Sequence, residues 1–221
     1  MRDAIVVYTD DYMAYDYVIQ ALNNLGLAYT AYYSDYAGFE AAVASGTYDL
    51  ILVNHQNYFE VSNVWDDLLT QLNAGKAAIL CTFDCDASDD YSGYMDDLLA
   101  YAGHQWNVDL STPATIYGWA HIPNPWWAGM SASISGVDNY FDDGDCLFGD
   151  AAYAFAGNTP AYTNGNVMMS AHADFIMACW APDEYPAADA IQWWMNCISW
   201  ILLPPSPTEE GTWGAIKELY R

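Results

Sequence analysis

Residues 49–83 read DLILVNHQNYFEVSNVWDDLLTQLNAGKAAILCTF, and this stretch decides the fold class. Its two ends, 49–54 and 77–83, are apolar at consecutive positions, as strands buried on both faces are. Between them, 64–72 has apolar residues at helical spacing and stops at the turn 73–75 (NAG). A strand, a helix and a second strand in this order predict two parallel strands joined by a crossover helix.

The same alternation extends outward in both directions from this segment. Repeated strand–helix units form parallel sheets with helices on both faces. The sequence therefore predicts an α/β fold, a flavodoxin-like, doubly wound and mostly parallel sheet covered by helices on both faces. The remaining expected elements are strands at 4–9, 28–33, 167–170 and 175–180, and helices at 13–25, 38–45, 94–102 and 187–203.

Residues 106–166 interrupt this pattern. They are rich in Gly, Pro, Trp, Asn and Asp and show little periodicity, so we expect a loop-rich aromatic insertion with short strands. One α/β domain is expected over residues 1–204, and it includes this insertion. Residues 205–221 are expected to form a linker, which overlaps the proline-rich stretch PPSPTEE, and a short C-terminal tail.

The charge of the chain is strongly one-sided. Among 221 residues there are 29 acidic and 4 basic side chains, giving a formal net charge of -25. Nucleic acids and anionic membrane surfaces are recognised through Lys and Arg, so the sequence argues against both as partners. No apolar run reaches the roughly 20 residues of a transmembrane helix. We expect neither a membrane span nor a nucleotide cofactor.

Composition also bears on where the protein works. The chain contains 19 Tyr and 10 Trp, and its 23 Asp outnumber its 6 Glu. A surface with few Lys and many Tyr, Thr, Ser and Asn is typical of secreted proteins, so an extracellular or cell-surface location is expected. The first strand pattern follows Met1 and Arg2 directly, without a signal peptide. The extracellular expectation thus implies that the numbering begins at a mature or excised domain, and the alternative is a cytoplasmic protein starting at Met1.

Five cysteines leave at least one thiol outside any intramolecular disulfide. Cys81 and Cys197 lie in apolar runs and are expected in the core. A disulfide such as Cys85–Cys146 is compatible with the sequence, which leaves the pairing open.

Four pieces of sequence, in their order along the chain, resemble a known superfamily. Their arrangement is similar to that of the class I glutamine amidotransferase-like superfamily, over roughly residues 4–203. The nearer likeness is to its non-catalytic branch, which includes ThuA-like domains and domains attached to secreted bacterial proteins. The four pieces are AIVVYTDD (4–11), YDLILVNHQN (48–57), LNAGKAAILCTFD (72–84) and FIMACWAPDEYP (175–186).

The stretches that match the superfamily's catalytic motifs lack its catalytic residues. Active members carry a nucleophilic Cys between glycines at a sharp strand-to-helix turn, whereas 80–85 (LCTFDC) has no glycine. Cys81 is expected to point into the sheet, and Cys85 comes too late in the chain to replace the nucleophile. Active members also have a His-Pro-Glu triplet after a late strand, and Trp180 stands here where the His would be. The resemblance therefore implies that amidotransferase activity is absent.

Two groups of Asp residues are candidate sites for a hard cation, and calcium is the expected ion because it prefers several carboxylate oxygens. The first group lies at a strand's carboxyl end, where ligands bind in this fold class. In the second group, Gly144 allows a tight turn and few basic residues are at hand to neutralise the acids. For both, the alternative is a solvated acidic loop. The groups are Asp84, Asp86, Asp89 and Asp90, and Asp142, Asp143, Asp145 and Asp150.

A set of aromatic residues is the candidate binding or interface surface. Exposed, these rings would stack on sugars or pack against a neighbouring subunit; buried, they would form core beneath the loops. The sequence leaves both alternatives open. The set is Trp106, Tyr117, Trp119, Trp126, Trp127, Tyr140 and Trp213.

These observations lead to two hypotheses about function. The first is a non-catalytic, extracellular binding or self-assembly domain, stabilised by calcium, that contacts copies of itself or carbohydrate through the aromatic loops. A chain with a net charge of -25 repels its copies, so assembly would need divalent ions or salt. The alternative is a hydrolase of a glycan or an amide that uses His55, Asp10, Asp11 and Asp84 at the strand ends.

Overall fold

The computed structural model describes residues 4–10, 15–56, 63–83, 85, 94–110, 114–137 and 144–202. Its strands are β1 (Ile5–Thr9), β2 (Thr30–Tyr33), β3 (Leu50–His55), β4 (Ala77–Thr82), β5 (His104–Asp109), β6 (Thr115–Gly118), β7 (Ser133–Ser135), β8 (Asp145–Gly149), β9 (Ala154–Gly157), β10 (Val167–His172) and β11 (Phe175–Cys179). Its helices are α1 (Tyr17–Asn24), α2 (Tyr36–Ala44), α3 (Val64–Asn73), α4 (Tyr94–Tyr101) and α5 (Ala187–Leu202), with the short 3₁₀ helices η1 (Pro125–Trp127) and η2 (Pro182–Glu184).

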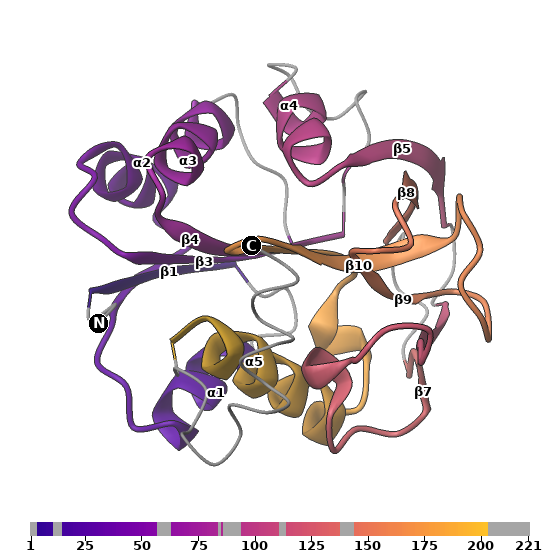
Figure 1. Cartoon of the computed structure of the whole chain (residues 1–221). Helices are drawn as coiled ribbons and strands as arrows, with labels where there is room; N and C mark the ends of the chain where they lie inside the picture. The colour runs from indigo at the N-terminus through magenta and orange to yellow at the C-terminus, as the bar shows by residue number, and fades with distance from the viewer. Residues whose placement is uncertain are drawn as a thin grey trace, which may run out of the picture.

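One half of the sheet is parallel, in the order β2-β1-β3-β4-β11. Helices α2, α3 and α4 cover one face of it, and α1 and α5 cover the other (Figure 1). Successive residues of β1 point to opposite faces, so Val7 joins the core beneath α1 while Val6 joins the core beneath α2. This two-sided burial explains the unbroken apolar runs, and the expected flavodoxin-like α/β fold is confirmed.

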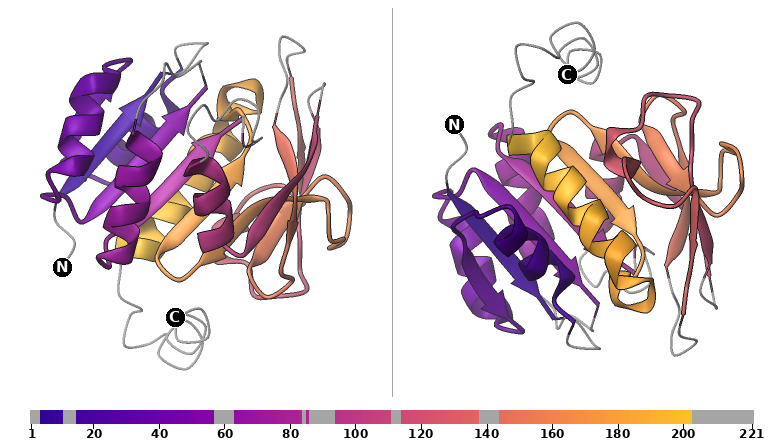
Figure 2. Two further views of the ribbon diagram at one scale, coloured as in Figure 1. Left: turned by 90° about the horizontal axis from the view of Figure 1, so that it is seen from above. Right: turned by 90° about the horizontal axis from the view of Figure 1, so that it is seen from below.

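The other half of the sheet is antiparallel. β10 pairs with β11, and β9, β6 and β7 follow beyond β10. β8 also pairs with β10 and holds β5 on its other side. Figure 2 shows the two halves lying side by side, with α5 crossing the face seen from below. The short strands expected in 106–166 are therefore present, and they continue the same sheet rather than forming a separate layer.

The core contains several large aromatic side chains. On the α1–α5 face, Trp126 stacks on Phe155 with ring centroids 4.9 Å apart and meets Trp200 edge-on at 5.0 Å. Trp193 and Trp194 of α5 are fully buried on the same face. Within the described part of the chain, no helix combines the length and the apolar character needed to cross a membrane.

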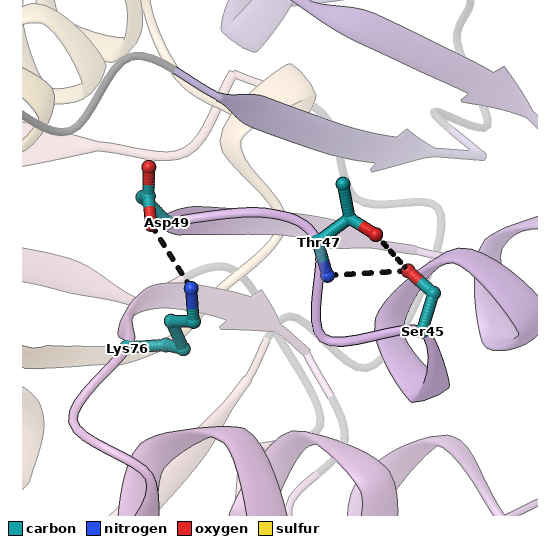
Figure 3. A network of polar contacts seen from close by, with 4 residues as sticks. All are labelled: Ser45, Thr47, Asp49 and Lys76. Carbon is teal, nitrogen blue, oxygen red and sulfur yellow. Dashed lines mark hydrogen bonds and ion pairs between the residues drawn. The ribbon is translucent and has the colours of Figure 1, made fainter.

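Positive charge lies at the amino edge of the parallel strands. The structure describes one basic side chain, Lys76, which precedes β4 and pairs with Asp49 at 3.0 Å, just before β3 (Figure 3). Next to this pair, the Ser45 hydroxyl after α2 bonds the Thr47 hydroxyl at 2.9 Å. Among the described residues, the opposite, carboxyl edge therefore has acidic and neutral groups but no Lys or Arg.

Candidate functional site

Buried polar residues gather at the carboxyl edge of the parallel strands. β1 ends at Thr9, which pairs with Asn54 of β3, and His55 of β3 pairs with Thr82 of β4. Because parallel strands in register end together, their polar terminal residues meet at this edge. The 3₁₀ helix η2 comes back over the edge after β11. The buried polar members of the edge are Thr9, Asp10, Asn54, His55, Gln56, Thr82, Asp183 and Glu184.

Asp10 is held by groups of the protein itself. Its Oδ1 accepts the backbone N–H of Gln56 at 2.6 Å, and its Oδ2 accepts the Tyr8 hydroxyl at 3.1 Å. Burial, together with the neighbouring Asp10 carboxylate, raises the pKa of Tyr8 far above its usual value, so this hydroxyl stays a donor. Asp10 thus joins the end of β1 to the end of β3.

Amide side chains extend this network across the edge. Asn54 Nδ2 donates to Thr9 Oγ1 at 3.3 Å, and that hydroxyl donates to Asp16 Oδ1 at 3.0 Å. The Gln56 amide lies between Asn54 and Asp183. We assign its nitrogen to the Asp183 side, 2.9 Å from Oδ2, because an amide oxygen there would face another acceptor. The Gln56 amide thereby joins η2 to the end of β3.

His55 is fixed between a hydroxyl and two aromatic rings. Its Nδ1 lies 2.8 Å from Thr82 Oγ1, and its ring packs against Trp65 and Phe83 at centroid distances of 5.8 and 6.0 Å. His55 and Asp10 are each only 6% exposed. Among the described residues, both side chains therefore hold the ends of neighbouring strands together.

The two cysteines nearest the end of β4 are buried. Cys81 lies in the core, and its Sγ donates to the Trp180 carbonyl at 3.5 Å. Burial raises the pKa of Cys81 well above its usual value, which suppresses the thiolate that a nucleophile needs. Cys85 is also fully buried, and its Sγ lies 2.7 Å from the Sγ of Cys179. The expectation that Cys81 points into the sheet is confirmed.

The described members of the second acidic group do not converge. Asp145 begins β8 and is buried, where it accepts the Cys85 backbone N–H at 2.5 Å and the Trp106 indole N–H at 3.0 Å. Asp150 follows the other end of β8, is exposed, and accepts the N–H of Ala152 at 2.8 Å. A strand of this length separates them by about 17 Å. A calcium site that includes both of these residues is therefore wrong.

No three His, Cys, Asp or Glu side chains within the described ranges are placed to hold a metal ion. The other acidic candidates fall outside those ranges, as do Tyr140 and Trp213 of the aromatic set. These acidic residues are Asp11, Asp84, Asp86, Asp89, Asp90, Asp142 and Asp143.

The aromatic set divides into buried and half-buried members. Three members are buried: Trp119, Trp126 and Trp127. They therefore form core beneath the loops, and their rings are not available to stack on a sugar or pack against a neighbouring subunit. The burial of Trp126 depends on rings contributed by β9 and α5, which no local sequence pattern reveals. Trp106 and Tyr117 are half-buried.

Trp106 and Tyr117 stand at the two ends of one row across the antiparallel strands. Along this row, Trp106 pairs with Leu147, Leu147 with Val167, Val167 with Gly157, and Gly157 with Tyr117. Directly paired residues share a face, and the buried members of the row belong to the same core as α2, α3 and α4. Aromatic side chains thus cover this part of the face.

Two further residues, which the sequence analysis did not assign to the aromatic set, complete this surface. Tyr162 lies 5.3 Å from Trp119 and 5.0 Å from His121 between ring centroids, and its hydroxyl donates to the Gly149 carbonyl at 2.7 Å. His121 is exposed and Tyr162 is half-buried. Both lie in stretches without periodicity, and no sequence signal marks them. We call Trp106, Tyr117, His121 and Tyr162 the aromatic cover.

No protein-family model matches the chain, and no curated protein matches its sequence. Solved structures share its fold. A ThuA-like protein from Bacteroides uniformis is 9% identical, with a TM-score of 0.54 over 91% of each chain. A ThuA-like protein from Parabacteroides merdae is 9% identical, with a TM-score of 0.53 over 90% of each. A glutamine amidotransferase from Thermotoga maritima is 7% identical, with a TM-score of 0.51 over 99% of this chain and 95% of that one.

At such low identity the likeness shows the fold alone. The chain has the fold of ThuA-like proteins and class I glutamine amidotransferases. The resemblance seen in the sequence is confirmed at this level, and activity has to be argued from the residues themselves.

Proposed function

We propose that this chain is a non-catalytic binding or self-assembly domain that works outside the cell. The observation that carries the proposal is the burial of the thiols at the end of β4. Cys81 and Cys85 are both fully buried, and His55 turns its Nδ1 to Thr82 rather than to a sulfur atom. Acyl transfer by a Cys nucleophile needs an accessible thiolate beside a base, whereas the polar residues described at this edge are buried and joined by hydrogen bonds.

The described residues of the carboxyl edge, which include Asp10 and His55 but neither Asp11 nor Asp84, give the hydrolase alternative no support. A catalytic carboxylate or imidazole has to reach substrate, whereas Asp10 and His55 are buried and engaged with Gln56, Tyr8 and Thr82. Their contacts stabilise the ends of neighbouring strands.

The aromatic cover is the surface through which we propose that the domain binds. Half-buried Tyr and Trp rings and an exposed His ring offer flat apolar faces with polar edges, which suit the ring faces of sugars or a matching surface on a second copy. Because the chain is strongly acidic, the fitting carbohydrate is a neutral one.

Calcium belongs to the self-assembly part of the proposal. Two copies with a charge of -25 each repel one another, and divalent cations at exposed Asp residues would reduce that repulsion. Light scattering of the full chain with calcium chloride and with EDTA tests this part. Assembly that increases with calcium and reverses with EDTA supports this part of the proposal. Assembly that EDTA does not change would mean that calcium plays no part in it.

The binding surface is tested with variants of the aromatic cover. Binding of a panel of neutral oligosaccharides is measured by calorimetry, and self-association by light scattering, for the wild type and for Tyr162→Ala and Trp106→Ala. The matched control is Tyr33→Ala, because Tyr33 is 56% exposed but lies on the edge strand β2 of the parallel half. We expect binding or association to fall at least tenfold in the first two variants and to stay unchanged in the control. Equal effects in all three, or none in any, would contradict the proposed surface.

A further inference from the structure

Two cysteines from distant parts of the chain meet where the parallel and antiparallel halves join. Cys85 follows β4, Cys179 ends β11, and 94 positions separate them in the sequence. Their Sγ atoms are 2.7 Å apart, and both residues are fully buried. A disulfide bond has an S–S distance of about 2.05 Å, so only a small further approach would join them.

The backbone N–H of Cys85 is held by the first residue of β8. The N–H of Cys85 donates to Oδ2 of Asp145 at 2.5 Å, and Oδ1 of Asp145 accepts the indole N–H of Trp106 at 3.0 Å. Asp145 is itself buried. The position of Cys85 therefore rests on a fixed carboxylate, independently of its sulfur contact.

The backbone of Cys179 is held from the same strand. Gly144 precedes β8 with a φ of +132°, and a Cβ at this position would lie 2.2 Å from the Cys179 carbonyl oxygen. Only glycine allows the chain to pass this closely over the end of β11. Gly144 and Asp145 thus position both cysteines. The contact between the two sulfur atoms therefore follows from the fold itself.

Three other thiols are alternative partners for a disulfide with Cys85 or Cys179. Cys146 is the next residue of β8, and burial with the nearby Cys179 raises its pKa to about 12. Cys81 is also close enough to Cys179 for their charges to interact. Cys197 lies on α5, fully buried. The sequence left Cys85–Cys146 open as a pairing, whereas the contact in the structure is between Cys85 and Cys179.

We propose that Cys85 and Cys179 form a disulfide that fastens the segment after β4 to the end of β11. This inference is independent of the proposed binding function. The two thiols lose two protons and two electrons as the S–S bond forms, and the electrons reduce a small-molecule disulfide such as oxidised glutathione to two thiols. The bond forms while the chain folds, because both sulfurs are out of reach of an oxidant in the folded protein.

The pairing is tested by refolding the full chain from denaturant in a glutathione redox buffer and, separately, in excess reductant. Free thiols are then alkylated under denaturing conditions. Chymotrypsin is the suitable protease, because the only Lys or Arg between residues 3 and 216 is Lys76. Cleavage after aromatic residues places Cys85 in 84–91 and Cys179 in 176–180, apart from each other and from the remaining cysteines.

We expect mass spectrometry to find peptide 84–91 joined to 176–180 after oxidative refolding, and both alkylated after refolding in reductant. Cys81, Cys146 and Cys197 should be alkylated in both samples. Alkylation of all five cysteines after oxidative refolding would overturn the proposal. A link from Cys85 or Cys179 to any other cysteine would overturn it as well.

Stability gives a second readout. A bond that closes so long a loop should raise the Tm of the oxidised protein on the order of 10 °C above that of the reduced protein. Cys85→Ser should abolish this difference between oxidised and reduced samples, whereas the control Cys197→Ser should keep it. An oxidation-dependent Tm shift that persists in Cys85→Ser would contradict the assignment, and peptide mapping of the wild type decides the question if that variant fails to fold.

Discussion

The parallel and antiparallel halves of the sheet bury the same face by different means. Over the parallel half, α2, α3 and α4 shield the central strands β1, β3 and β4, and Val6 and Ile51 beneath them are almost inaccessible. Over the antiparallel half, individual rings such as Trp106 and Tyr162 cover Leu147 and Val167 and remain partly in contact with solvent. A helix can shield a sheet without offering a binding surface, whereas aromatic side chains do both. This comparison is why the proposed binding surface is on the antiparallel half.

The largest effect is expected where the antiparallel half is fully buried. Trp126→Ala removes a ring that stacks on Phe155 and meets Trp200, so it should lower the free energy of unfolding by about 4 kcal/mol. Tyr117→Ala, on the half-buried aromatic cover, should cost only about 1 kcal/mol. Urea denaturation measures both. Equal losses would mean that the aromatic cover is ordinary core and would break the comparison.

This contrast also separates what could be predicted from the sequence from what could not. β3 and β4 were predicted to within one residue, because burial on both faces leaves a continuous apolar run. β6 was not located, because only Ile116 among its residues is fully buried and no period is visible. Trp126 is buried by partners more than 25 residues away in the chain. Its sequence neighbours therefore could not show whether it is buried or exposed.

The candidate site shows the same division. The carboxyl ends of β1, β3 and β4 could be listed as the polar edge, because strand order alone brings them together. The grouping of Asp145 with Asp150 in one candidate calcium site could not be checked from the sequence, because the partners of Asp145, the Cys85 N–H and the Trp106 indole, come from other parts of the chain. Long-range contacts of this kind leave no periodicity to detect.

Acid should weaken the interior of the antiparallel half. His104 of β5 is buried with Nε2 2.5 Å from the Ser170 hydroxyl of β10, and burial lowers its pKa from 6.5 to about 4. Between these two pH values the unfolded chain binds the extra proton, so stability should fall as the pH falls, by about 3 kcal/mol in total. His104→Gln should flatten this part of the profile in urea titrations. An unchanged slope would show that His104 is not the group responsible.

A side chain at position 144, where the parallel and antiparallel halves meet, should destabilise the protein. Gly144→Ala adds a Cβ 2.2 Å from the Cys179 carbonyl oxygen at a φ of +132°, and a loss of about 2 kcal/mol or more is expected. Gly75→Ala is the matched control, because its φ of +83° is also left-handed but nothing lies within 4 Å of the added Cβ. Its loss should stay near 1 kcal/mol. An equal loss in the free energy of unfolding in both variants would mean that the close contact with the Cys179 carbonyl is not what requires glycine at position 144.

The smallest effect is expected at the amino edge of the parallel half. The Lys76–Asp49 ion pair is partly exposed, so Lys76→Met should cost less than about 1 kcal/mol (Figure 3). The difference from the wild type should shrink further in high salt, as thermal denaturation at two salt concentrations will show. A large loss that salt does not reduce would mean that the parallel half depends on this pair and not on its helices.

The central claim is that the end of β4 holds no nucleophilic thiol, and thiol reactivity tests it most directly. The full chain is reduced, freed of reductant and treated with a disulfide reagent at neutral pH, and the modified cysteines are mapped by mass spectrometry. We predict that Cys81 and Cys85 react roughly 100-fold more slowly than free cysteine until denaturant is added, because both are fully buried. Modification of either residue in the folded protein as fast as free cysteine, together with release of ammonia from glutamine, would contradict the account.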